Sequence, residues 1–155
     1  MLQRIQSIYL FAAGLVIAAL FIFPLINNAY VDGQALTIKV TGVYQNINGQ
    51  QAQTQFFTAL TIGTALVALL PLVVVFMYKD RKKQINFCYL LMLINIGYSY
   101  WAAQVVKNTI GDAYLNMSNY GVGIILLSVS LILIVLGQKS IQKDEKLVRS
   151  ADRLR

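Results

Sequence analysis

The side chains that most often carry catalysis are scarce in this chain. Cys88 is the only cysteine, and there is no histidine. A thiol–disulfide catalyst needs a pair of cysteines, and zinc or haem sites draw mainly on histidine and cysteine ligands. Ser99, Ser128 and Ser130 have neither a histidine nor a lysine in their apolar surroundings to accept a proton. We therefore expect no catalytic residue, no cofactor and no metal site, a protein that is not an enzyme, and a buried apolar role for Cys88.

Uncharged polar side chains are the remaining chemical groups inside the apolar part of the chain. Asn95 and Ser99 stand four residues apart, which places them on one helix face, and Thr61 lies in the preceding apolar run. Hydrogen bonds between helices are the usual role of such groups in a membrane. We expect that role for all three; the alternative is a path for a substrate or lipid beside them. Since no Asp or Glu lies inside the apolar runs, the sequence argues against proton coupling through an embedded carboxylate.

Four apolar runs must position these groups, and none has a charged residue in its interior. They cover about 5–26, 56–78, 85–106 and 120–137. A helix needs about 20 predominantly apolar residues to cross the hydrocarbon core of a bilayer. The first run is too long for a signal peptide, and no A-x-A-like cleavage site follows it. We predict an all-α membrane protein, with a four-transmembrane-helix bundle over residues 1–137.

The segment 27–55, between the first two runs, changes from continuous apolarity to alternation. Apolar and polar residues alternate over Leu36–Val40, the period of a half-buried strand. Asp32-Gly33 and Asn48-Gly49 are dipeptides that hairpin turns favour, because both central positions need positive φ. We predict a small extracytoplasmic β-hairpin. It either caps the bundle or contacts a partner, and the sequence favours neither.

The basic residues are distributed very unevenly between the two sides of such a bundle. Of the 13 Lys and Arg residues, only Lys39 and Lys107 fall on the side of segments 27–55 and 107–119. Basic residues favour the cytoplasmic side, so both termini should be cytoplasmic. Charge concentrated there predicts contact with anionic lipid headgroups, or with a partner protein, and no nucleic acid partner. The residues concerned are Lys79, Arg81, Lys82, Lys83, Lys139, Lys143, Lys146, Arg149, Arg153 and Arg155.

The segment 138–155 is expected to form a basic amphipathic cytoplasmic helix. Ile141 and Val148, seven residues apart, mark its apolar stripe, and charged residues, Asp144 among them, occupy the rest of its surface. Glu145 stands four residues before Arg149, the spacing of a helical ion pair. The segment either extends the fourth apolar helix or turns along the lipid headgroups.

The two ends of the chain resemble a known family. The opening Met1–Leu10 (MLQRIQSIYL) and the closing Lys143–Arg155 (KDEKLVRSADRLR) are similar to the ends of a bacterial family of small four-span inner-membrane proteins, known as a domain of unknown function. The resemblance covers essentially the whole chain. It implies a multi-pass protein of the bacterial inner (cytoplasmic) membrane, and it brings no established activity, cofactor or catalytic residue.

The function that the sequence favours is that of a non-catalytic accessory, assembly or scaffold protein of the membrane. Its partner would be another membrane protein or a second copy of the chain. The alternative is a small transport or lipid-handling protein without a proton-coupling carboxylate. A cavity that touches Asn95, Ser99 and Thr61 would favour the alternative, whereas a dry interface there would favour the scaffold.

Overall fold

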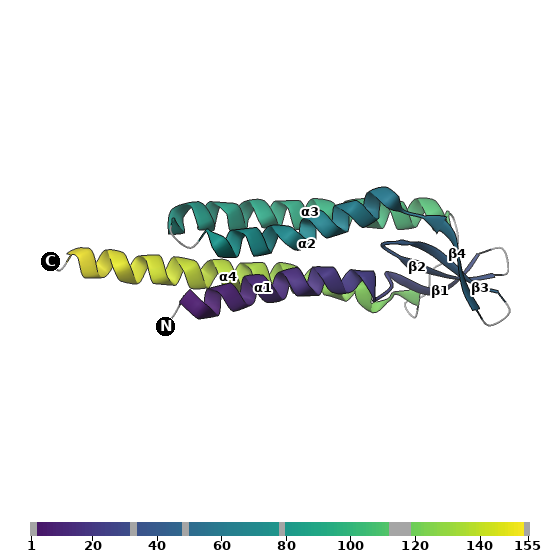
Figure 1. Ribbon diagram of the computed structural model, residues 1–155, viewed down its shortest axis with the longest axis horizontal. Helices are drawn as coiled ribbons and strands as arrows, with labels where there is room; N and C mark the ends of the chain where they lie inside the picture. The colour runs from purple at the N-terminus through teal and green to yellow at the C-terminus, as the bar shows by residue number, and fades with distance from the viewer. Residues whose placement is uncertain (1–2, 32–33, 48–49, 78–79, 112–118, 154–155) are drawn as a thin grey trace.

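The computed structural model describes residues 3–31, 34–47, 50–77, 80–111 and 119–153. Within these residues, four helices run along an elongated molecule and a four-stranded sheet lies at one end (Figure 1). The helices are α1 (Gln3–Ala18), α2 (Thr58–Phe76), α3 (Arg81–Ile110) and α4 (Val122–Arg153), with a short 3-10 helix η1 (Ala19–Phe21) after α1. The strands are β1 (Ile26–Val31), β2 (Gln34–Lys39), β3 (Gly42–Ile47) and β4 (Gln50–Phe56).

The prediction of an all-α bundle with four membrane spans is wrong. Among the described residues, only two helices are long and apolar enough to cross a membrane, α2 over Thr58–Phe76 and α4 over Val122–Val148. The regular helix α1 has only 16 residues, because the chain tightens into η1 and passes Pro24 before it enters β1. Helix α3 has 30 residues, but polar side chains interrupt its apolar sequence, so it is not one of these two helices.

The sheet is an antiparallel meander in the order β1-β2-β3-β4, twice the strands of the predicted hairpin. The alternation over Leu36–Val40 is present, since residues 36, 38 and 40 are buried and their neighbours are partly exposed. Strands β1 and β2 pair on either side of Asp32-Gly33, and β3 and β4 on either side of Asn48-Gly49. Both dipeptides lie outside the described residues. The outer strands, β1 and β4, show little alternation of their own. They are strands because their backbones pair with β2 and β3.

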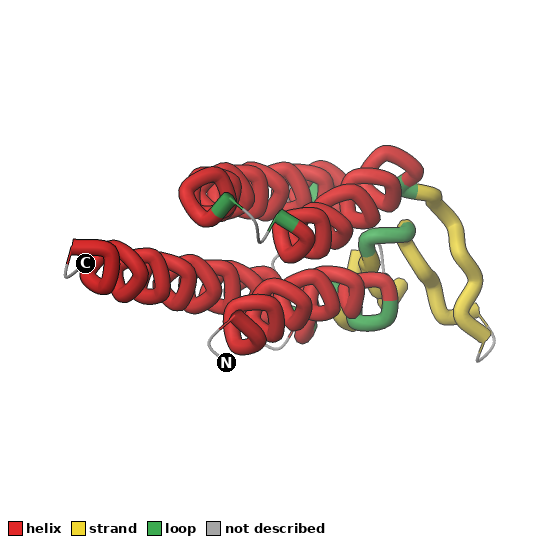
Figure 2. The backbone as a smooth tube through the Cα atoms, turned by 60° about the vertical axis from the view of Figure 1, so that its left-hand side comes forward, coloured by secondary structure: helices red, strands yellow, loops and turns green. Residues whose placement is uncertain are grey.

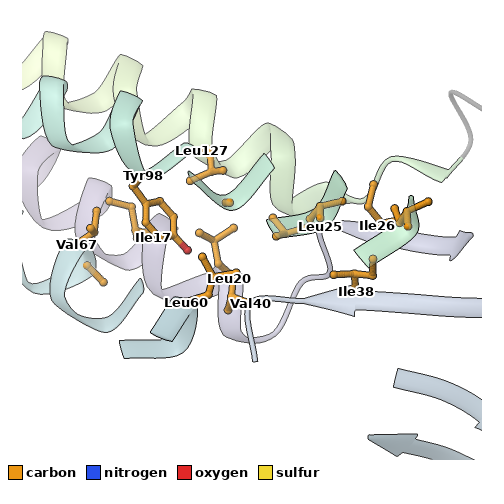
Figure 3. Close-up of a cluster of buried hydrophobic side chains, with 14 of the residues drawn as sticks. Ile17, Leu20, Leu25, Ile26, Ile38, Val40, Leu60, Val67, Tyr98 and Leu127 are labelled. Atoms are coloured by element: carbon orange, nitrogen blue, oxygen red, sulfur yellow. The ribbon is translucent and has the colours of Figure 1, made fainter. Parts of the chain in front are cut away.

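The helices lie side by side in a bundle, in which α1 packs on α4 and α3 packs on α2 (Figure 2). Helix α1 also packs on α2, and α3 on α4. One apolar cluster joins this bundle to the sheet: Leu20 of η1 and Leu60 of α2 lie beside Val40, which follows β2 (Figure 3). A second cluster, including Leu10, Cys88 and Ile134, fills the opposite half of the bundle.

Helix α4 is continuous through Gly137 to Arg153 and extends beyond the other helices at its C-terminal end (Figure 1). The segment 138–153 therefore extends the fourth helix and does not turn away from it. Of its predicted apolar stripe, Ile141 is fully buried whereas Val148 is exposed.

The start of α4 is clamped to the segment that precedes β1. The N–H of Gly121 donates to the carbonyl of Leu25 (2.8 Å), and the N–H of Gly123 donates to that of Pro24 (2.9 Å). A Cβ on Gly121 would lie 2.2 Å from the Pro24 carbonyl oxygen, so only glycine allows this approach. These two bonds, called the glycine clamp below, hold the start of α4 against the start of β1, where Ile26 also forms a bridge with Tyr120.

Candidate functional site

A pocket of about 720 Å³ lies between α3 and α4, next to the start of β1. Its wall is mostly aliphatic and includes Val106 and Ile110 of α3 and Leu127 of α4. The size is that of a site for a small organic ligand, and a mostly apolar wall with a few polar groups is typical of such sites. The polar exceptions are Asn95, Ser99, Lys107, Tyr120 and Ser128.

The pocket extends along α3 from the middle of the helix to its last turn. Asn95 and Lys107 are 107 − 95 = 12 residues apart. At a rise of about 1.5 Å per residue, they are separated by about 18 Å along the helix axis. Asn95 is only 1% exposed, whereas Lys107 is exposed at the end nearest the sheet. The lining of the pocket thus extends along α3 from a buried polar group at one end to a cation at the other.

Asn95 links the two helices that form the pocket. Its Nδ2 donates to Ser130 Oγ of α4 at 2.8 Å, and Ser130 in turn donates to the carbonyl of Leu127 at 2.7 Å. The remaining side-chain oxygen of Asn95, Oδ1, is buried without a hydrogen-bond partner among the described residues. Buried polar atoms are usually paired, and an unpaired one carries a free-energy penalty of about 1 to 3 kcal/mol.

The other two residues expected to join helices have different partners. Ser99 also lines the pocket, but its hydroxyl donates to the carbonyl of Asn95 in its own helix, at 2.8 Å. Thr61 lies away from the pocket, where its hydroxyl is 2.8 Å from the carbonyl of Phe57 and 3.1 Å from that of Val40. The structure thus brings Asn95 and Ser99 together and places Thr61 at the junction of α2 with the sheet.

A second polar contact between helices joins α2 to α3. The hydroxyls of Thr64 and Tyr98 are 2.5 Å apart, and Tyr98 also packs edge-on against Trp101. Sequence reasoning assigned Tyr98 no partner. The available signal was its position three residues after Asn95, which places both on the inner face of α3.

Sequence reasoning also missed a buried carboxylate in α4. Asp144 is 6% exposed, and its Oδ2 accepts a hydrogen bond from Nε2 of Gln6 in α1. Its other oxygen, Oδ1, has no partner among the described residues. The signal was present in the spacing, because the buried residues Ile134, Ile141 and Asp144 follow one another at intervals of seven and three along one face of α4. Asp144 is therefore not part of the exposed charged surface that the sequence predicted.

The predicted basic residues gather at the end of the molecule opposite the sheet, at the start of α3 and along the end of α4 (Figure 1). Lys82, Lys83, Lys139, Lys143 and Lys146 are exposed and Arg81 is partly buried. Lys79 and Arg155 lie outside the described residues, and only the backbone of Arg149 and Arg153 is described.

One of these basic residues has an acidic partner. Lys83 Nζ lies 2.9 Å from Asp80 Oδ2, and this hydrogen bond raises the pKa of Lys83 above its ordinary value. Both side chains are exposed, so the ion pair contributes little to stability.

Groups for redox or metal chemistry do not gather in the described part of the chain. Cys88 is fully buried, and no three His, Cys, Asp or Glu residues within the described ranges are placed to hold a metal ion. The pocket between α3 and α4 combines a mostly apolar wall, a buried amide and an exposed cation.

Comparison with known proteins identifies the family but no relative of known activity. No curated protein matches the chain. The sequence model of one family, described as a domain of unknown function (DUF4293), matches residues 2–154. The match spans nearly all of the chain, and the chain belongs to this DUF4293 family.

Proposed function

We propose that this chain is a multi-pass integral membrane protein that binds an acyl chain of a membrane lipid in the pocket between α3 and α4. One observation carries the proposal: the pocket is apolar and about as long as one leaflet is thick. Its lining extends for about 18 Å along α3, compared with about 15 Å for half of a hydrocarbon core of about 30 Å. No catalytic step is included, and lipid handling was the alternative that the sequence left open.

The outward faces of the helices support a position in the membrane. On α2, five large apolar side chains at intervals of three and four residues form an outward stripe, each between 55% and 77% exposed: Ile62, Leu66, Leu69, Val73 and Phe76. Only 28% of each spanning window of α2 and α4 is buried inside the protein. Contiguous apolar surface of this extent is unfavourable in water but suits contact with lipid chains.

The charge distribution supports one orientation, in the inner membrane of a bacterium. The exposed lysines of α3 and α4 lie at the end that holds both termini, which we place in the cytoplasm, with the sheet on the outer side. Cysteines introduced one at a time at Lys143 and Gln34, in a Cys88→Ala background, test this. A membrane-impermeant maleimide should label Gln34→Cys in intact spheroplasts and Lys143→Cys only after permeabilisation. The reverse pattern would overturn the orientation.

The lipid-binding role rests on which residues line the pocket. A cavity at Asn95 and Ser99 favours lipid handling over a dry scaffold interface, and both residues line it. The pocket differs from the expected path in two respects. The path was expected between the second and third apolar helices, whereas the pocket lies between α3 and α4, and Thr61 is not part of its lining. The hydrogen bond between Asn95 and Ser130 supports a fixed spacing of these helices beside the pocket.

Native mass spectrometry of the detergent-purified protein tests the role directly. Ala103 is a small, exposed residue in the pocket wall, so Ala103→Trp should fill the pocket and reduce retained lipid. Leu93→Trp is the matched control, because Leu93 is on the same helix, 71% exposed and outside the pocket. Equal lipid retention by both variants and the unaltered protein would refute the pocket as the lipid site.

The accessory role that the sequence favoured remains a second proposal, supported by the free edge of the sheet. Strand β4 pairs only with β3 among the described strands. Its sequence, QQAQTQF, has no charge or proline of the kind that usually blocks an edge from pairing with another chain. A membrane-protein partner or a second copy could add a strand there. Gentle purification should recover a stoichiometric companion that Thr54→Lys releases; a chain that always runs alone would contradict this role.

The cytoplasmic end provides the second test of the accessory role. Deleting residues 139–155 would remove Ile141 and Asp144, which are both buried against the bundle. A companion lost from that variant could not be distinguished from misfolding of the variant itself. Truncation after Lys146 spares them and removes only the end of α4. Loss of the companion with an unchanged melting temperature would support a contact at the inner end.

A further inference from the structure

The two ends of the α3–α4 pocket differ in the charge that they can accept. At the inner end, Asn95 Nδ2 donates one hydrogen bond to Ser130, and its oxygen Oδ1 is buried without a partner among the described residues. An oxygen acceptor repels an anionic group. At the other end stands Lys107, an exposed cation in the last turn of α3.

Lys107 has no opposing charge in the described part of the chain. The salt bridge between Lys83 and Asp80 lies at the far end of the molecule. The nearest acidic residue in sequence, Asp112, lies outside the described residues. The negative end of the α3 dipole meets the positive end of the antiparallel α4 dipole here, so the two largely offset each other. Lys107 thus places a positive charge in the lining at this end of the pocket.

The groups beside Lys107 are those of a membrane interface. Tyr120 lines the same end of the pocket and is 53% exposed, and tyrosine is enriched where lipid headgroups meet the hydrocarbon core. From there toward Asn95 the wall is formed mainly by aliphatic side chains, such as Ile124 and Leu131 of α4. A ligand that matches this order of groups has a charged head, an interfacial region and a long apolar chain.

We propose that the pocket selects an anionic lipid, with the headgroup phosphate beside Lys107 and one acyl chain running along α3 and α4 toward Asn95. The inference rests on the proposed lipid-binding function and adds the class of lipid and its direction. A lysine near an anionic phosphate favours it by about 1 kcal/mol, which corresponds to about a five-fold tighter binding.

Two lipids with identical acyl chains and different headgroups separate these claims. The purified protein is titrated with phosphatidylglycerol, which is anionic, and with phosphatidylcholine, which is zwitterionic, and bound lipid is counted by native mass spectrometry. We expect phosphatidylglycerol to bind about five-fold more tightly, and the advantage to shrink as ionic strength rises. Equal binding of both lipids would overturn the charge selection but leave the proposed function intact, whereas binding of neither would overturn the function itself.

Substitutions assign the effect to one residue. Lys107→Gln should remove the advantage of phosphatidylglycerol and leave phosphatidylcholine binding unchanged. Lys39→Gln is the matched control, since it removes an equal charge from the sheet, outside the pocket. Ala103→Trp should weaken the binding of both lipids. If Lys39→Gln removes the advantage as fully as Lys107→Gln, the selection is a property of the whole surface and the proposal fails.

A final arm distinguishes a lipid from a free anion. Inorganic phosphate in large excess should displace little phosphatidylglycerol once the ionic strength is matched with chloride, because most of the binding comes from the acyl chain. Displacement by phosphate alone would show a simple anion site at Lys107 and would overturn the lipid proposal.

Discussion

Gly121 offers the sharpest test of how the pocket is assembled. It joins the start of α4 to the Pro24–Leu25 segment, with its N–H bonded to the carbonyl of Leu25 at 2.8 Å. In Gly121→Ala, the added Cβ would lie 2.2 Å from the carbonyl oxygen of Pro24 and 2.9 Å from its carbonyl carbon. Both are backbone atoms, so relief requires α4 and the entry to β1 to move apart.

The expected loss follows from overpacking in a site that cannot yield by rotating a side chain. Inserting one methyl group into a closely packed site typically destabilises a protein by about 1 to 3 kcal/mol. For a chain of this length, each kcal/mol lowers the melting temperature by roughly 2 to 4 °C, so we expect a decrease of about 2 to 12 °C. Leu25 and Ile26 line the pocket, so bound lipid should decrease as well.

Gly97→Ala provides the matched control for the same chemical change. Gly97 lies within α3, and a Cβ there would meet nothing within 4 Å. Because glycine is unfavourable inside a helix, this change should be neutral or stabilising by up to about 1 kcal/mol. Thermal unfolding in detergent, followed by tryptophan fluorescence, compares the two variants. Equal melting temperatures for Gly121→Ala and Gly97→Ala would refute the clamp.

Three further predictions concern buried side chains of the bundle. Tyr98→Phe removes the hydroxyl that meets Thr64 and should lower the free energy of unfolding by about 0.6 kcal/mol. An unchanged unfolding curve in detergent would show that this hydrogen bond does not stabilise the fold. Gln6→Leu leaves the buried Asp144 without its partner and should destabilise by about 1 to 3 kcal/mol, whereas adding Asp144→Leu should recover most of the loss; strictly additive losses would contradict this coupling. Cys88 should react with a membrane-permeant maleimide only after denaturation, as followed by intact mass, and rapid labelling of the folded protein would contradict its burial.

Helix positions were predictable because they depend on local composition. Helices α2, α3 and the first part of α4 lie largely within the apolar runs 56–78, 85–106 and 120–137. The number of spans was predicted wrongly because apolar length alone does not reveal where a helix ends. The first run continues to Ile26, but its last residues form η1, the turn at Pro24 and the start of β1. The pairing of Ile26 with Ile38 takes that end of the run into the sheet.

The sheet was half predicted for a similar reason. Strand β2 has one buried and one partly exposed face, so its own sequence alternates and can be recognised. Strand β4 is polar along its length, and only its pairing with β3 makes it a strand. A pattern within one segment cannot report a hydrogen-bond partner in another segment.

For the candidate site, too, some features follow from the sequence and others only from the packing of distant segments. The sequence alone determined that the chain is apolar, has one cysteine and no histidine, and carries most of its basic residues in the segments 79–83 and 139–155, because these are properties of composition and order. It also singled out Asn95 and Ser99 by their spacing. Only the tertiary structure decided that Asn95 meets Ser130 beside a pocket and that Gln6 meets Asp144. It also decided that the glycine clamp joins the start of α4 to the segment before β1. Those contacts join segments far apart in the chain, and their geometry arises only when the helices pack.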